Sequence, residues 1–203
     1  MRVKICGITR QEDLLAAVAA GADALGFVFA PRSRRVLDPD TAAALARRVP
    51  PFVSRVGLFM DQDSEQVRRI LDRVPLSLLQ FHGHEDAAFC RRFGLPYIKA
   101  LAMGSAPSLA HAARSFADAA GLLLDSHRSG ETGGTGRTFD WAGVPDLELP
   151  LILAGGLTPD NVRQAVRQVR PWAVDVSSGV EDAPGIKNAE KMKIFISEAK
   201  SEY

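Results

Sequence analysis

The sequence is poor in cysteine, in net charge and in long apolar segments, and each shortage excludes a class of protein. Only two cysteines occur in 203 residues, so a disulfide-stabilised secreted fold is not expected. The formal net charge of +1 gives no general field for nucleic acid or for an anionic membrane surface. No apolar run approaches the roughly 18 to 20 residues that cross a bilayer. A strand-like segment begins directly after Met1, so we expect no signal peptide and a cytoplasmic protein without nucleic-acid or membrane partners.

Short apolar segments, most of them followed by a helical pattern, recur along the whole chain. Eight are candidate strands at an average spacing of about 24 residues, which is typical of repeated βα units and a parallel sheet. They begin near Val3, Ala24, Val53, Ser77, Tyr97, Gly121, Leu151 and Ala173. We therefore predict an α/β fold, a single (β/α)₈ TIM barrel over residues 1–203, with an open doubly wound sheet as the alternative. The absence of a GxGxxG motif after the first strand favours the barrel.

Several helix ends can be predicted from local patterns. Thr9 begins a capping-box pattern, and Asp63 is expected to cap the helix after the third strand. Thr158 followed by Pro159 has the form of an N-cap and a first-turn proline. The segment 126–137 is instead rich in glycine and lacks a helical pattern, as functional loops often do.

Polar or reactive residues stand at the carboxyl ends of six of the eight predicted strands. This is the edge where barrel enzymes gather their catalytic residues. In chain order the residues are Cys6, Arg35 in the loop after the second strand, Gln80, His82, Asp125, Gly155, Gly156, Asp175, Ser177, Ser178 and Gly179. Folding alone does not account well for this distribution, so we predict a site at this edge.

Cys6 and Asp125 are the candidates for proton transfer. An isolated cysteine on an apolar strand is usually a small buried hydrophobe, and we keep that interpretation for Cys90. Cys6, however, is followed by Gly7 and shares its strand end with polar residues. A thiol with an ordinary pKa of about 8.5 is a usable base where its surroundings favour the thiolate. Asp125 is either a loop cap or an acid, and the glycine-rich segment after it favours the acid because such a loop can close over substrate.

Small residues end the seventh and eighth strands. Gly155-Gly156 and Ser177-Ser178-Gly179 are expected to expose backbone N–H groups. The loops after these two strands are the usual phosphate site of a TIM barrel, so we predict a phosphate site here.

Two pairs of side chains share a face of their strands. Lys4 precedes Cys6 by two residues and points to the same side, where Asp175 on the adjoining strand is its expected partner. The lysine–aspartate pair is either purely structural or part of the site. Gln80 and His82 are likewise on one face and are expected to contact substrate.

Taken in order, these residues make the chain resemble the phosphoribosylanthranilate isomerases, barrel enzymes of tryptophan biosynthesis. The matching segments span nearly the whole chain and are Lys4–Thr9, Gly26–Phe29, Gln80–Gly83, Gly133–Gly136 with Phe139–Trp141, Leu153–Leu157 and Val174–Glu181. Phe81 stands where that family usually has leucine, which should alter only packing. Arg34 stands where the family usually has proline, and alignment with Ser33 favours Arg35 as the arginine that meets the substrate.

The resemblance implies an aldose–ketose isomerisation, the Amadori rearrangement of N-(5′-phosphoribosyl)anthranilate to 1-(2-carboxyphenylamino)-1-deoxyribulose 5-phosphate. It implies that Asp125 protonates the ring oxygen and that Cys6 removes the C2′ hydrogen. Arg35 would hold the anthranilate carboxylate, and Gly156, Ser178 and Gly179 would hold the phosphate. The substrate supplies its own electron sink, so neither a metal nor an organic cofactor is expected. Beyond this phosphorylated small molecule, the partners considered are neighbouring enzymes of the pathway, by association or by fusion.

Two other functions stay open at this point. One is the histidine-pathway aminoaldose isomerase, a phosphosugar isomerase on the same fold that resembles two fused half-barrels and has an aspartate in place of Cys6. The other is a non-catalytic phosphosugar-binding barrel that serves as a partner subunit. A binding module needs neither Cys6 nor Asp125, so the presence of both argues against it.

Overall fold

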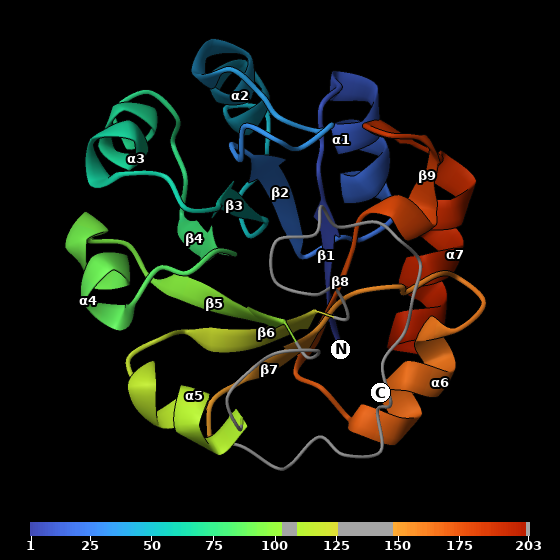
Figure 1. Ribbon diagram of the computed structural model, residues 1–203. Coiled ribbons are helices and arrows are strands. Elements are labelled where there is room, and N and C mark those ends of the chain that lie inside the picture. The colour runs from blue at the N-terminus through green and yellow to red at the C-terminus, as the bar shows by residue number, and fades with distance from the viewer. Residues whose placement is uncertain (103–108, 126–147, 202–203) are drawn as a thin grey trace.

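Eight parallel strands form a closed barrel in the computed structural model, which describes residues 1–102, 109–125 and 148–201 (Figure 1). The strands are β1 (Arg2–Cys6), β2 (Ala24–Val28), β3 (Ser54–Phe59), β4 (Leu78–Phe81), β5 (Tyr97–Ala102), β6 (Gly121–Asp125), β7 (Leu151–Leu153) and β8 (Ala173–Val176). Each begins within one residue of its predicted start. The last strand pairs with the first, which confirms the barrel and excludes the open doubly wound sheet.

Helices surround the barrel on its outside (Figure 1). They are α1 (Gln11–Ala19), α2 (Pro39–Ala46), α3 (Ser64–Leu71), α4 (Ala87–Cys90), α5 (Leu109–Ser115), α6 (Val162–Val169) and α7 (Ala189–Lys200). Short 3₁₀ turns follow at η1 (Arg91–Phe93) and η3 (Ser178–Val180). A small antiparallel hairpin of β9 (Glu181–Ala183) and β10 (Ile186–Lys187) then leads from β8 into α7. Among the described residues, no helix is long and apolar enough to span a membrane.

Apolar side chains fill both sides of the barrel wall, as the continuous apolar runs in the sequence predict. Leu123 of β6 points into the barrel and packs in an interior cluster with Ile98 and Ile152 from the neighbouring strands. Leu122 and Leu124, on the same strand, pack outward in a cluster that includes α5. Side chains from β5 to β8 thus fill this part of the barrel interior.

One of the three predicted helix caps is confirmed and two are wrong. The Asp63 side chain accepts from the third residue of α3, and that residue returns the bond to the backbone of Asp63. Thr9 does not cap α1, because its hydroxyl donates to the carbonyl of Gly185 in the hairpin loop. Thr158 does not cap α6, whose N-cap is Asn161. In both cases a hydrogen bond that the local sequence pattern does not indicate determines how the helix begins.

The glycine-rich segment 126–137, with the family matches at 133–136 and 139–141, lies outside the described residues.

Candidate active site

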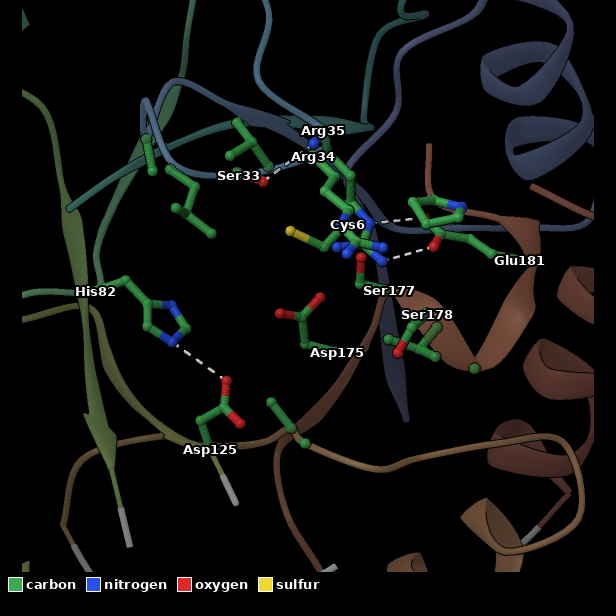
Figure 2. A pocket seen from close by; sticks show the side chains of 18 of the residues that line it. Cys6, Ser33, Arg34, Arg35, His82, Asp125, Asp175, Ser177, Ser178 and Glu181 are labelled. Carbon is green, nitrogen blue, oxygen red and sulfur yellow. Dashed lines mark hydrogen bonds and ion pairs between the residues drawn. The ribbon is translucent and has the colours of Figure 1, made fainter. Parts of the chain in front are cut away.

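The carboxyl ends of the barrel strands surround a cavity of about 550 Å³ (Figure 2). Its lining includes every residue predicted for the site: Cys6, Arg35, Gln80, His82, Asp125, Gly155, Gly156, Asp175, Ser177, Ser178 and Gly179. The side chains come from β1, β4, β6 and β8 and from the loops that follow β2 and β7. Within the described ranges, no three His, Cys, Asp or Glu side chains are grouped as a metal site.

Lys4 and Asp175 form the expected buried ion pair beside Cys6. The Lys4 Nζ lies 2.9 Å from the Asp175 Oδ1, and the two residues face each other in the β1–β8 register. Burial alone would lower the pKa of Lys4, but the attraction of Asp175 and then of Cys6 outweighs it, so Lys4 stays an ammonium. Gly26 on β2 makes room for this group, because a Cβ there would overlap the Cys6 sulfur. Asp175 also lines the cavity, so the pair is at once a structural contact and part of the site wall.

The surroundings of Cys6 act on its thiol in both directions. Burial is the largest influence and raises the pKa of Cys6 above the ordinary value, with Asp175 adding to it. Lys4 and, more weakly, Lys187 oppose this rise by favouring the thiolate. The thiol is therefore the main form near neutrality, and the two lysines limit the free energy needed to ionise it. Cys90 instead packs in the core, where burial raises its pKa to about 12, as its interpretation as a small hydrophobe implies.

A chain of hydrogen bonds runs from Gln80 through His82 to Asp125. The Gln80 Nε2 lies 3.2 Å from the His82 Nδ1. The His82 Nε2 lies 3.2 Å from the Asp125 Oδ2 (Figure 2). With the Gln80 amide N–H donating to Nδ1, the Nε2 of the ring faces the Asp125 carboxyl group as a donor. The Gln80 Oε1 is buried, and the structure gives it no partner among the described residues. These two residues thus support Asp125, a role that the sequence did not predict.

Arg35 is held by Glu181, which Lys187 contacts in turn, and neither Glu181 nor Lys187 was predicted for the site. Its Nε and Nη2 donate to the two carboxylate oxygens of Glu181 at 2.7 and 2.6 Å. The Lys187 Nζ donates to the same carboxylate at 2.7 Å. Burial alone would raise the pKa of Glu181, but Arg35 and Lys187 together hold it below its usual value. Glu181 ends the last family-like segment in the sequence, whereas no sequence signal points to Lys187.

The predicted phosphate loops depend on glycine for steric reasons. Gly155 and Gly156 have φ angles of 81° and 65°, in the left-handed region that other residues rarely adopt. A Cβ at Gly179 would overlap the carbonyl oxygen of Leu157, so glycine lets the loops after β7 and β8 approach each other. Asn161, which the sequence did not indicate, donates to the Gly156 carbonyl at 2.9 Å and fixes this turn.

Comparison with known proteins agrees with this geometry over the full chain. The family model for N-(5′-phosphoribosyl)anthranilate isomerase matches residues 3–198. The N-(5′-phosphoribosyl)anthranilate isomerase of Thiobacillus denitrificans is 59% identical over 202 residues, which are 99% of this chain and 98% of that one. The enzyme of the same name from Nitrosococcus oceani is 52% identical over 96% of this chain and 95% of its own.

Solved structures give the same result. Phosphoribosyl anthranilate isomerase from Thermus thermophilus superposes with a TM-score of 0.86 at 42% identity over 100% of both chains. A phosphoribosyl anthranilate isomerase in complex with reduced 1-(o-carboxyphenylamino)-1-deoxyribulose 5-phosphate superposes with a TM-score of 0.84 at 41% identity over 98% of both chains. Fold, cavity and comparisons lead to one assignment: the chain belongs to the N-(5′-phosphoribosyl)anthranilate isomerase family.

Proposed function

We propose that this chain isomerises N-(5′-phosphoribosyl)anthranilate in tryptophan biosynthesis, with Cys6 as the base and Asp125 as the acid. The observation that carries the proposal is that both side chains line one cavity, from β1 and from β6. A volume of about 550 Å³ is within the usual range for a small-molecule site. The cavity lining includes Arg35 together with Gly156 and Ser178, which suits a substrate with a carboxylate and a phosphate.

Asp125 opens the ribose ring in this mechanism. Its protonated carboxyl group donates a proton to the ring oxygen as the bond from C1′ to that oxygen breaks. The lone pair of the anthranilate nitrogen moves in to form a C1′=N iminium. The carboxylate that remains accepts the N–H of His82, which lies 3.2 Å away and stabilises the new negative charge.

Cys6 then removes the C2′ hydrogen. The thiolate takes the proton, the electron pair of the C–H bond forms a C1′=C2′ bond, and the nitrogen regains its lone pair. Loss of the O2′ proton and addition of a proton at C1′ complete the ketone. The iminium of the substrate is the electron acceptor, so no step runs through a metal or an organic cofactor. Because burial raises the pKa of Cys6, we expect the limb of the pH–rate profile that belongs to Cys6 to lie above the ordinary thiol value.

The remaining residues bind the substrate in this proposal. Arg35 holds the anthranilate carboxylate by charge-assisted hydrogen bonds. Backbone N–H groups of Gly156, Ser178 and Gly179 hold the phosphate. Asp175 and the unpartnered Oε1 of Gln80 are acceptors for the sugar hydroxyls, which fits their burial in the cavity wall.

Turnover of N-(5′-phosphoribosyl)anthranilate, followed by the loss of its fluorescence, tests the function directly. The expected result is isomerisation of this substrate. Turnover of only the histidine-pathway substrate would favour the alternative isomerase, and binding without turnover would favour the non-catalytic barrel.

We also propose that residues 1–203 form one domain that acts in the cytoplasm. Association with, or fusion to, neighbouring enzymes of the tryptophan pathway stays a prediction. Co-purification of the chain with those enzymes is the measurement that addresses it.

A further inference from the structure

Two charged side chains lie behind Arg35, and both come from the hairpin that follows β8. Glu181 is on β9 and Lys187 is on β10. The side chain of Lys187 is 0% exposed and that of Glu181 is 4% exposed, so both are withdrawn from solvent. We propose that Glu181 and Lys187 are positioning residues that aim Arg35 into the cavity and so make the site selective for a substrate that carries a carboxylate. The inference rests on the role of Arg35 in the proposed function.

The hydrogen-bonding geometry of Arg35 leaves one edge of its guanidinium for a ligand. A guanidinium has five N–H donors arranged as two forks. Glu181 occupies the fork made by Nε and Nη2, with both bonds shorter than 2.8 Å. The second fork, made by Nη1 and Nη2, matches a planar carboxylate. A flexible arginine would lose conformational entropy on binding substrate, and Glu181 fixes its orientation beforehand.

The stem of Arg35 is fixed as well. Gly7 has a φ of 78°, and a Cβ at this position would overlap the Cδ of Arg35. The arginine stem therefore lies directly against the Gly7 backbone at the end of β1. With its stem on Gly7 and its head on Glu181, the side chain is restrained at both ends.

The charges in this group explain why Glu181 does not simply compete with a substrate carboxylate. Glu181 alone would neutralise Arg35 and remove its attraction for an anion. Lys187, at 2.7 Å, adds a second positive charge to the same carboxylate. Burial lowers the pKa of Lys187, and the attraction of Glu181 opposes that change. Two cations and one anion leave one positive charge, which one carboxylate of the substrate balances.

The hairpin is anchored so that it can serve as a rigid support. The Lys187 backbone N–H donates to the Asp13 Oδ2 at 3.0 Å, and Arg10 holds the same carboxylate at 2.6 Å. The Lys187 Nζ also donates to the Ser177 carbonyl at 3.1 Å. Lys187 thus connects the support of Arg35 to the end of β8, where the phosphate loop begins. The spacing between the carboxylate fork and the phosphate loop is set by this connected unit.

A matched pair of ligands tests the inference. The first is reduced 1-(o-carboxyphenylamino)-1-deoxyribulose 5-phosphate, and the second is its phenylamino counterpart, which lacks only the carboxylate. Glu181→Gln keeps the size of the side chain but leaves one carbonyl oxygen for two cations. We expect the dissociation constant of the Glu181→Gln variant for the first ligand to rise about tenfold or more. An effect of this size is usual for residues that are coupled in one hydrogen-bond network. The second ligand, measured by the same calorimetry, should change by less than about twofold, which also shows that the variant is folded.

Glu190→Gln is the matched control, since it makes the same substitution at the start of α7, just after the hairpin. The Glu190 side chain is exposed and does not line the cavity. Both ligands should bind this variant as they bind the parent. Adding Glu181→Gln to Arg35→Ala should weaken the first ligand no further than Arg35→Ala alone, because in this proposal Glu181 affects the bound carboxylate through Arg35.

Three results would overturn the inference while leaving the proposed function intact, provided that Arg35→Ala alone weakens the first ligand selectively. They are equal weakening of both ligands by Glu181→Gln, additive effects of the two substitutions, and tighter binding of the first ligand by Glu181→Gln. If Arg35→Ala has no selective effect, the carboxylate role of Arg35 in the proposed function is itself wrong, and the inference fails with it.

Discussion

Cys6 responds to charges of both signs, so single substitutions should move the pKa of its thiol in opposite directions. Lys4 lowers this pKa and Asp175 raises it, both against the larger effect of burial, which raises it. Lys4→Met should therefore raise the pKa of Cys6 further, and Asp175→Asn should lower it. The pH dependence of alkylation by iodoacetamide measures both shifts, and Cys90 does not interfere because its pKa is about 12. Shifts of the same sign in the two variants would contradict this description of the site.

The pKa of Cys6 should also determine how activity depends on pH. In the proposed mechanism the thiolate is the working form, and burial raises the pKa of Cys6 above its ordinary value. The limb of the profile of kcat/KM against pH that reports Cys6 should therefore lie above the ordinary thiol value. The other limb belongs to Asp125, which must carry a proton to act as the acid. Lys4→Met should move the Cys6 limb to still higher pH in parallel with the alkylation profile. A limb that stays in place while the alkylation profile moves would mean that another group is the base.

Replacing Cys6 and replacing Asp125 should have different kinetic effects. Cys6→Ser and Asp125→Asn should each lower kcat by roughly 10² to 10⁴, the usual contribution of a positioned base or acid. Only the Cys6 step breaks a carbon–hydrogen bond. A C2′-deuterated substrate should therefore show an enhanced isotope effect with Cys6→Ser and none with Asp125→Asn. Cys90→Ala should keep normal kinetics, and equal isotope effects in the two site variants would mean that their roles are confused.

At the scale of the helices and strands, the sequence predicts what depends on local pattern. The strands were found because continuous apolar runs belong to segments buried on both faces, such as 122–124. The predicted site residues follow from strand ends, since all parallel strands of a barrel end at one edge. Thr9 and Thr158 were misassigned because Gly185 and Asn161 determine the geometry around them.

The hairpin that carries Glu181 and Lys187 shows why part of the site could not be predicted. Its strands are three and two residues long, too short for a periodic pattern. Lys187 owes its place to a backbone bond with Asp13, 174 positions earlier in the chain. Such a contact exists only once β1 and β8 are neighbours, so no local reading of the sequence reveals it.

A buried ion pair beneath the loop after β4 should stabilise that element strongly. The Lys99 Nζ lies 2.9 Å from the Glu85 Oε2, and Glu85 also accepts the backbone N–H groups of Asp61 and Gly83. Lys99→Met leaves Glu85 charged and buried, which should cost about 3 to 5 kcal/mol in the free energy of unfolding measured with urea. The double variant Lys99→Met/Glu85→Gln should recover part of that loss. If the single and double variants are equally unstable, the charge of Glu85 is not the cause.

At the scale of the whole molecule, the barrel separates a packed interior from a polar rim. Inorganic phosphate or sulfate should bind at the rim and inhibit competitively. A crystal soaked in either anion should place it against the backbone N–H groups near Gly156 and Ser178, in the lining of the cavity. An anion found only beside Arg32, Arg34 or Arg35 would remove the phosphate assignment.

The first and last strands close the barrel by pairing with each other, so the site cannot be completed until β8 has been synthesised. Cys6 and Lys4 lie on β1, whereas Asp175, the partner of Lys4, lies 171 positions later on β8. The ribosome makes β1 first, and β1 has no β8 to pair with until the last strand has been synthesised. A nascent or truncated chain that ends before β8 therefore carries the Cys6 thiol and Lys4 but lacks Asp175, so the ion pair beside Cys6 cannot form. Nearly the entire polypeptide must be synthesised and released before the first molecule of substrate is converted.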